Sequence, residues 1–258
     1  MKKFFSWLLM GGALFLTSCE VTREISIKPD GSGVMVTTTD LSSVIGMAKM
    51  AGQGKELDKM EDKSIDTTIA LASIADSIPD LTADERSLIK KGTLGFNMNM
   101  ADEKFITKVE LPFSGVDQIA TLDKLTGKAF KEAMKKQMDN EKGEGEAEEN
   151  AQAPGADDIP EGSIEDYFVT TYSKGLISKT LNKEKYATVD QDEAMQALKQ
   201  MSSMGAGTTT LVFNLPNAVK KAEGKNVKVS DDKKKVTITS STEDFFSDAS
   251  ALEFRIEY

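Results

Sequence analysis

The pattern of apolar and polar residues predicts a chain built largely from β-hairpins. Residues 24–29 and 34–39 alternate between apolar and polar side chains, and Asp30-Gly31-Ser32-Gly33 between them has the composition of a turn. The side chains expected to face inward are Ile25, Ile27, Val34 and Val36.

The same alternation recurs along the chain and predicts further strands. They are expected over residues 65–71, 93–100, 104–113, 167–172, 176–181, 208–215, 227–229, 235–239 and 252–258. Residues 65–71 also fit a helix, and we favour the strand. In 93–113, Leu94, Phe96, Met98 and Met100 are expected to face Phe105, Thr107, Val109 and Leu111.

Helices are predicted where apolar residues recur at intervals of three and four. A short helix is expected over 40–48, and Thr82 with Glu85 forms a capping box for a helix that ends before Gly92. A longer helix is expected over 116–138, where Gly127 is a candidate break, and another after Asp190.

Strands that recur in hairpins, with few helices between them, indicate an α+β fold. We expect an antiparallel β-sheet with helices packed on one face. The predicted organisation is a first half of the ectodomain over 19–138, an acidic flexible linker over 139–163 and a second half over 164–258. We favour one composite domain, and two lobes remain an alternative.

The first eighteen residues have the features of a secretory leader. Lys2 and Lys3 precede an apolar run that ends at Leu16 and carries no further charge. The run holds about 13 apolar residues, fewer than the roughly 17 to 25 that a spanning helix needs. Residues 1–18 are therefore predicted to be a signal peptide.

The leader ends in Leu16-Thr17-Ser18-Cys19, which resembles the lipobox of bacterial lipoproteins. That resemblance implies that a diacylated lipid is attached to the Cys19 sulfur through a thioether, that the chain is cleaved before Cys19, and that the new amino group is often acylated as well. Cys19 is the only cysteine, so this chain cannot form an internal disulfide. We expect lipid attachment at Cys19, a tether to the cell envelope, and the outer rather than the inner membrane. The alternatives are an ordinary signal peptide that happens to end in cysteine and a short buried apolar segment.

The excess of acidic residues is concentrated in one segment. The chain has a net charge of −10, and residues 139–161 hold nine acidic residues against one lysine. This segment has almost no large apolar residues, so it cannot bury enough surface to offset the entropy of ordering. Calcium binding is the alternative, but the acids do not follow the twelve-residue calcium-loop spacing. The rest of the chain is nearly balanced, which argues against nucleic acid as a partner.

Catalytic and metal chemistry is restricted by composition. The chain has no histidine and its one cysteine is expected to carry lipid, which excludes histidine triads, cysteine nucleophiles and zinc sites with nitrogen or sulfur ligands. Asp30–Gly33 could be proposed as a phosphate or metal loop, but the flanking alternation favours a hairpin turn. We predict no catalytic residue, no metal site and no cofactor.

The chain resembles uncharacterised envelope lipoproteins of the Bacteroidota and, more faintly, LppM-type lipoproteins. The resemblance comes from the leader, from Pro29-Asp30-Gly31-Ser32-Gly33 and from Leu211-Val212-Phe213-Asn214-Leu215-Pro216 with the strands after it. It implies an α+β ectodomain with a role in lipid or envelope interactions. LppM-type proteins usually bear a C-terminal membrane helix, which we do not expect here because no long apolar run occurs near residue 258, and no functional residue can be transferred.

These observations favour a non-enzymatic, lipid-anchored binding or scaffold module. Its membrane contact would be the lipid on Cys19, and its partner an envelope protein or an amphiphilic ligand. The alternatives are a carboxylate-dependent envelope hydrolase, because acids are abundant, and a structural spacer.

Overall fold

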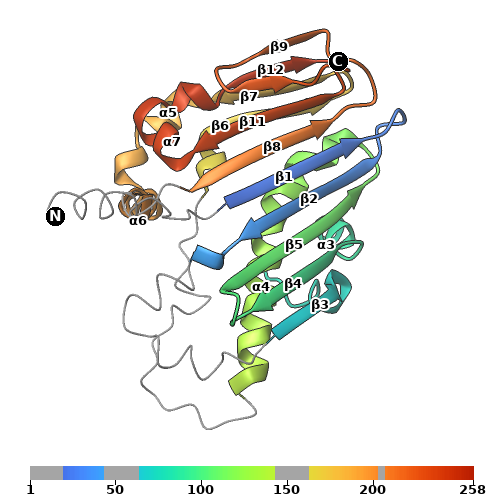
Figure 1. Ribbon diagram of the computed structural model, residues 1–258, viewed down its shortest axis with the longest axis vertical. Coiled ribbons are helices and arrows are strands. Elements are labelled where there is room, and N and C mark those ends of the chain that lie inside the picture. The colour runs from blue at the N-terminus through green and yellow to red at the C-terminus, as the bar shows by residue number, and fades with distance from the viewer. Residues whose placement is uncertain (1–19, 44–63, 143–162, 203–206) are drawn as a thin grey trace, which may run out of the picture.

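The computed structural model describes residues 20–43, 64–142, 163–202 and 207–258. Within these ranges the strands form an eight-stranded sheet and a four-stranded sheet, and the expected α+β fold is confirmed (Figure 1). The predicted helix over 40–48 lies mostly outside the described residues, as does most of the acidic segment.

The eight-stranded sheet has the order β10-β11-β8-β1-β2-β5-β4-β3. Its strands are β1 Glu20–Ile27, β2 Gly33–Asp40, β3 Ser64–Ala70, β4 Thr93–Asn99, β5 Lys104–Phe113, β8 Thr208–Asn214, β10 Val227–Val229 and β11 Lys235–Ser241. The sheet therefore combines strands from both sides of the acidic segment. All of its pairings are antiparallel except β1 with β8, which run parallel from Glu20 opposite Thr208 to Ser26 opposite Asn214.

The hairpin of β1 and β2 is confirmed, but the predicted inward face of β2 is wrong. Ile25 lies opposite Met35 and Ile27 opposite Gly33, so Met35 and Thr37 are buried, while Val34 and Val36 face the other side. Three consecutive apolar residues, Val34 to Val36, leave the face undetermined locally. The turn sets the register, and a shift of one residue reverses every side chain.

Helices cover one half of the buried face of this sheet. They are α3 Ala83–Ile89 and α4 Ile119–Lys142, with a short 3-10 helix, Val116–Gln118, before α4. The predicted capping box of α3 is present, and α4 continues through Gly127 without a break. The stripe Ile119, Leu122 and Leu125 is fully buried against the sheet. Figure 1 shows both helices behind the strands, on a single side of the sheet.

The four-stranded sheet covers the other half. Its order is β6-β7-β12-β9, formed by β6 Phe168–Ser173, β7 Leu176–Leu181, β9 Lys221–Glu223 and β12 Phe254–Glu257. The Phe213 ring of β8 packs 5.9 Å from the Phe254 ring of β12, and Ile177 and Ile256 join the same core. The predicted hairpin of β6 and β7 is confirmed. The second sheet as such was not anticipated.

A smaller apolar cluster lies beneath α5 Lys183–Tyr186, α6 Glu193–Ser202 and α7 Thr242–Asp248. Phe245 is at its centre, with the rings of Tyr167 and Tyr186 5.5 and 5.4 Å away. The Tyr167 hydroxyl donates to Asp192 at 2.7 Å, and burial raises the pKa of Tyr167 to about 12. Through this cluster the three short helices pack against the second sheet.

Candidate functional site

The predicted lipid-attachment residue, Cys19, lies outside the described residues. The next residue, Glu20, lies in β1, opposite Asp40 of β2 and Thr208 of β8. The structure therefore leaves the acylation of Cys19 a prediction, and it shows what the chain does immediately afterwards.

The most unusual chemistry inside the fold lies where α4 meets the second sheet. We call this the seam cluster, formed by Arg23, Asp123, Glu165, Tyr172 and Lys179. Arg23 shares the inward face of β1 with Ile25, and its guanidinium forms an ion pair with the Asp123 carboxylate of α4. The two side chains are only 15% and 14% exposed. A charged residue on the apolar face of a strand thus meets one on the apolar face of a helix.

The second ion pair of the seam cluster joins Lys179 to Glu165. Lys179 Nζ lies 2.8 Å from Glu165 Oε1, and the lysine side chain is 5% exposed. The same ammonium group lies 4.3 Å from the centre of the Phe168 ring, a favourable cation–π position. Burial of this lysine is therefore compensated by a carboxylate and an aromatic face.

The electrostatics of the seam are dominated by burial. Burial raises the pKa of the Asp123 carboxyl, Arg23 opposes that rise and Glu165 adds to it. Burial also raises the pKa of Tyr172, with a further contribution from Asp123. Arg23 Nε and the hydroxyl of Thr37, directly across on β2, are buried without a protein hydrogen-bond partner. Charge is thus held in the seam at an energetic cost.

The seam cluster contains two cations and two carboxylates, so its side chains largely neutralise one another. Across the four described ranges, no group of three or more His, Cys, Asp or Glu side chains could hold a metal ion. The arrangement suits a structural role, in which specific ion pairs join a helix, a strand and a second sheet.

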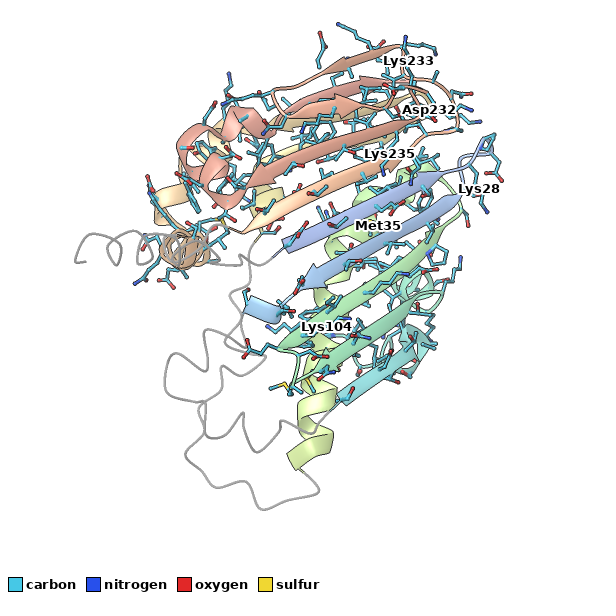
Figure 2. All side chains as sticks on the ribbon, in the orientation of Figure 1. Lys28, Met35, Lys104, Asp232, Lys233 and Lys235 are labelled. Carbon is cyan, nitrogen blue, oxygen red and sulfur yellow. The ribbon has the colours of Figure 1, made fainter. Side chains whose placement is uncertain are left out.

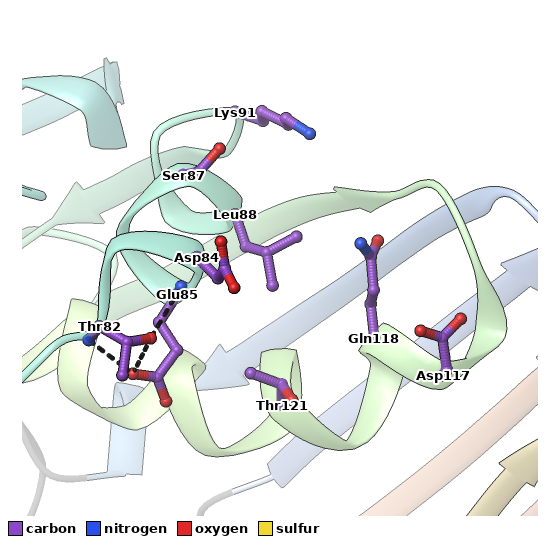
Figure 3. A pocket seen from close by; sticks show the side chains of 9 residues that line it. All are labelled: Thr82, Asp84, Glu85, Ser87, Leu88, Lys91, Asp117, Gln118 and Thr121. Atoms are coloured by element: carbon purple, nitrogen blue, oxygen red, sulfur yellow. Dashed lines mark hydrogen bonds between the residues drawn. The ribbon is translucent and has the colours of Figure 1, made fainter.

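A separate hollow of about 460 Å³ lies between α3 and the start of α4 (Figure 3). It is lined by Thr82, Asp84, Glu85, Ser87, Leu88, Lys91, Asp117, Gln118 and Thr121. Glu85 Oε2 accepts hydrogen bonds from the Thr82 N–H at 2.9 Å and from the Thr82 hydroxyl at 2.8 Å. These bonds lower the pKa of Glu85, whereas a catalytic acid near neutral pH needs a raised pKa. Glu85 therefore serves the helix cap.

The turn Asp30–Gly33 is a hairpin turn, as the sequence predicts. Asp30 Oδ1 accepts from the Ser32 N–H at 2.9 Å and from the Ser32 hydroxyl at 2.7 Å. Gly31 has φ of 89°, a conformation that favours glycine. The aspartate is occupied by the turn itself, which explains the motif without a ligand.

Comparisons with protein-family models, with curated proteins and with solved structures found no match. The resemblance to envelope lipoproteins therefore stays a prediction from the sequence. In the part of the chain that the structure describes, no helix has the length and apolar character needed to cross a membrane.

The sequence predictions missed the seam cluster, although a signal was present. Arg23 has the same strand parity as Ile25 and Ile27, and Lys179 has that of Ile177. Asp123 follows Leu122 on the buried stripe of a helix. A charged residue at an apolar position usually requires a buried partner, but the alternation of apolar and polar residues does not identify that partner.

Proposed function

We propose that this chain is a lipid-anchored protein of the bacterial cell envelope whose folded body is a non-enzymatic binding or scaffold module. The observation that carries the proposal is the junction at residue 19. A charged and then apolar leader ends in Leu16-Thr17-Ser18-Cys19, and the next residue, Glu20, lies in β1 of the sheet. An acylated Cys19 would then be the mature amino terminus and the membrane contact.

The character of the body supports a binding or scaffold role. The buried charges of the seam pair with one another, and Glu85 in the hollow caps a helix. The face of the eight-stranded sheet turned away from α3 and α4 carries polar side chains such as Thr22, Thr38 and Thr237, and no described helix covers it (Figure 2). The partner would be an envelope protein or an amphiphilic ligand, and the location the outer membrane.

Metabolic labelling with an azide analogue of palmitate tests the anchor. The full-length chain is expected to incorporate the label and to sediment with membranes. Cys19→Ala is expected to lose both properties. A matched control combines Cys19→Ala with Lys28→Cys, which restores one thiol at an exposed turn outside the lipobox, and it is expected to stay unlabelled. Absence of label from the unaltered chain would refute the proposal.

A further inference from the structure

The start of β1 leaves no room for a linker between the predicted anchor and the fold. Glu20 follows Cys19 directly, and the Cα atoms of consecutive residues are about 3.8 Å apart. Glu20 is already paired on both sides, with Asp40 of β2 and with Thr208 of β8. Glu20 is therefore held by neighbouring strands on both sides within the eight-stranded sheet.

Glu20 belongs to a continuous row of residues that are paired across neighbouring strands at one end of the sheet. We call this row the amino-terminal edge, and its residues, aligned by strand register, are Ser241, Thr208, Glu20, Asp40 and Ile106. Hydrogen bonds hold the edge together. Asp40 Oδ1 accepts from the Ser42 N–H at 2.9 Å, and the Leu41 N–H donates to the Phe105 carbonyl at 2.8 Å.

We propose that the amino-terminal edge faces the bilayer, with the turn Lys28–Ser32 directed away from it. This inference rests on the proposed function, because it takes Cys19 as acylated. A tether of one residue holds this edge at the lipid headgroups. A strand of eight residues separates it from the turn, which at about 3.3 Å per residue places the turn roughly 26 Å farther out.

The chemistry of the surface fits contact with headgroups rather than insertion. Glu20 and Lys104 at this end are exposed and opposite in charge, and Ser241, Thr208 and Asp40 are polar. The face of the sheet turned away from α3 and α4 also carries charges of both signs, on Glu24, Lys108 and Lys235. Among the described residues, apolar side chains such as Ile106 at the edge and Val34 and Val36 on the strand face are interspersed with these polar groups. The position of the tether therefore sets the orientation.

Energy transfer to a labelled lipid tests the orientation in the full acylated chain. Acylation consumes the sulfur of Cys19, so an introduced cysteine is the sole free thiol for a donor dye. The matched pair is Lys104→Cys at the amino-terminal edge and Lys28→Cys at the turn, which lie at opposite ends of the sheet in Figure 2 and remove the same charge. Vesicles carry an acceptor on the headgroup. The donor at residue 28 is expected roughly 25 Å farther from the acceptor plane than the donor at residue 104.

A linker variant supplies the second measurement. Twenty Gly/Ser residues inserted between Cys19 and Glu20 span about 25 Å, which is enough for the body to turn freely. In this variant the difference between the two donors is expected to collapse, while the chain stays in the membrane fraction. Equal transfer from the two donors in the acylated chain without the insertion would overturn the orientation alone. A chain that carries no lipid would instead refute the proposed function.

Discussion

Arg23 and Asp123 are the residues whose placement most strongly constrains the packing of this protein. Each lies on an otherwise apolar face, and each is more than four-fifths buried in its side chain. Their attraction offsets the loss of hydration only when both are present, because a single buried charge has no compensation. The pair therefore specifies how α4 sits on β1, while adding little net stability.

Single and double substitutions of this ion pair are expected to change the free energy of unfolding very differently. Asp123→Ala leaves Arg23 buried and unpaired, and it is expected to lower the free energy of unfolding by about 3–5 kcal/mol. Arg23→Met combined with Asp123→Leu is expected to match or exceed the stability of the unaltered chain. Urea unfolding followed by circular dichroism measures both. Lys225→Ala, which breaks an exposed pair with Asp248, is the control and should change stability by less than about 1 kcal/mol. A double variant as unstable as Asp123→Ala would show that the ion pair itself stabilises the fold.

At the scale of elements, the hairpin of β1 and β2 depends on close approach at its turn end. Gly33 faces Phe113 of β5, and a Cβ atom at residue 33 would overlap the Ser26 carbonyl and the Phe113 ring. The carbonyl belongs to the backbone of β1 and cannot move aside. Gly95 of β4 is different, because its nearest neighbour to an added Cβ would be the Thr68 hydroxyl at 3.6 Å, an ordinary contact.

The two strand glycines therefore make a matched pair of substitutions. Gly33→Ala is expected to lower the free energy of unfolding by about 1–3 kcal/mol through overpacking. Gly95→Ala is expected to be neutral, or to stabilise by up to about 1 kcal/mol, because alanine restricts the unfolded chain. Thermal and urea unfolding of both variants provide the measurement. Equal effects at the two positions would show that strand glycine entropy, and not the contact with Ser26, is what matters.

At the scale of the whole molecule, the two halves of the chain share one sheet and one core. β1 pairs with β8 along its length, and Ile25 packs in the same apolar cluster as Phe213 and Ile177. Separating the halves would expose the parallel pairing and the buried face beneath it. The two halves are therefore joined by hydrogen bonds between strands as well as by the chain segment that connects them.

Shared pairing predicts a single cooperative unfolding transition. The four tyrosines all lie after residue 163 and the only tryptophan is Trp7, so in a chain that lacks the predicted leader tyrosine fluorescence reports the second half alone. Phe105→Trp on β5 adds a probe of the first half. The urea midpoints from tryptophan, tyrosine and far-ultraviolet circular dichroism are expected to coincide. Separate midpoints would show two independently folding lobes.

Most of the local elements could be predicted from the sequence because their causes are local. Alternation marked β4 and β5, the Thr82–Glu85 capping box marked α3, and Asp30 with Gly31 marked the first turn. The absence of histidine and the position of Cys19 are likewise properties of the sequence itself. They limit the chemistry of the chain however it folds.

Contacts between distant segments could not be predicted from local sequence patterns. The parallel pairing of β1 with β8 and the second sheet over the same core join residues nearly two hundred positions apart. The inward face of β2 and the partner of Arg23 also depended on that assembly. Alternation and capping act within a few residues, whereas register and buried ion pairs are chosen by the packing of whole layers.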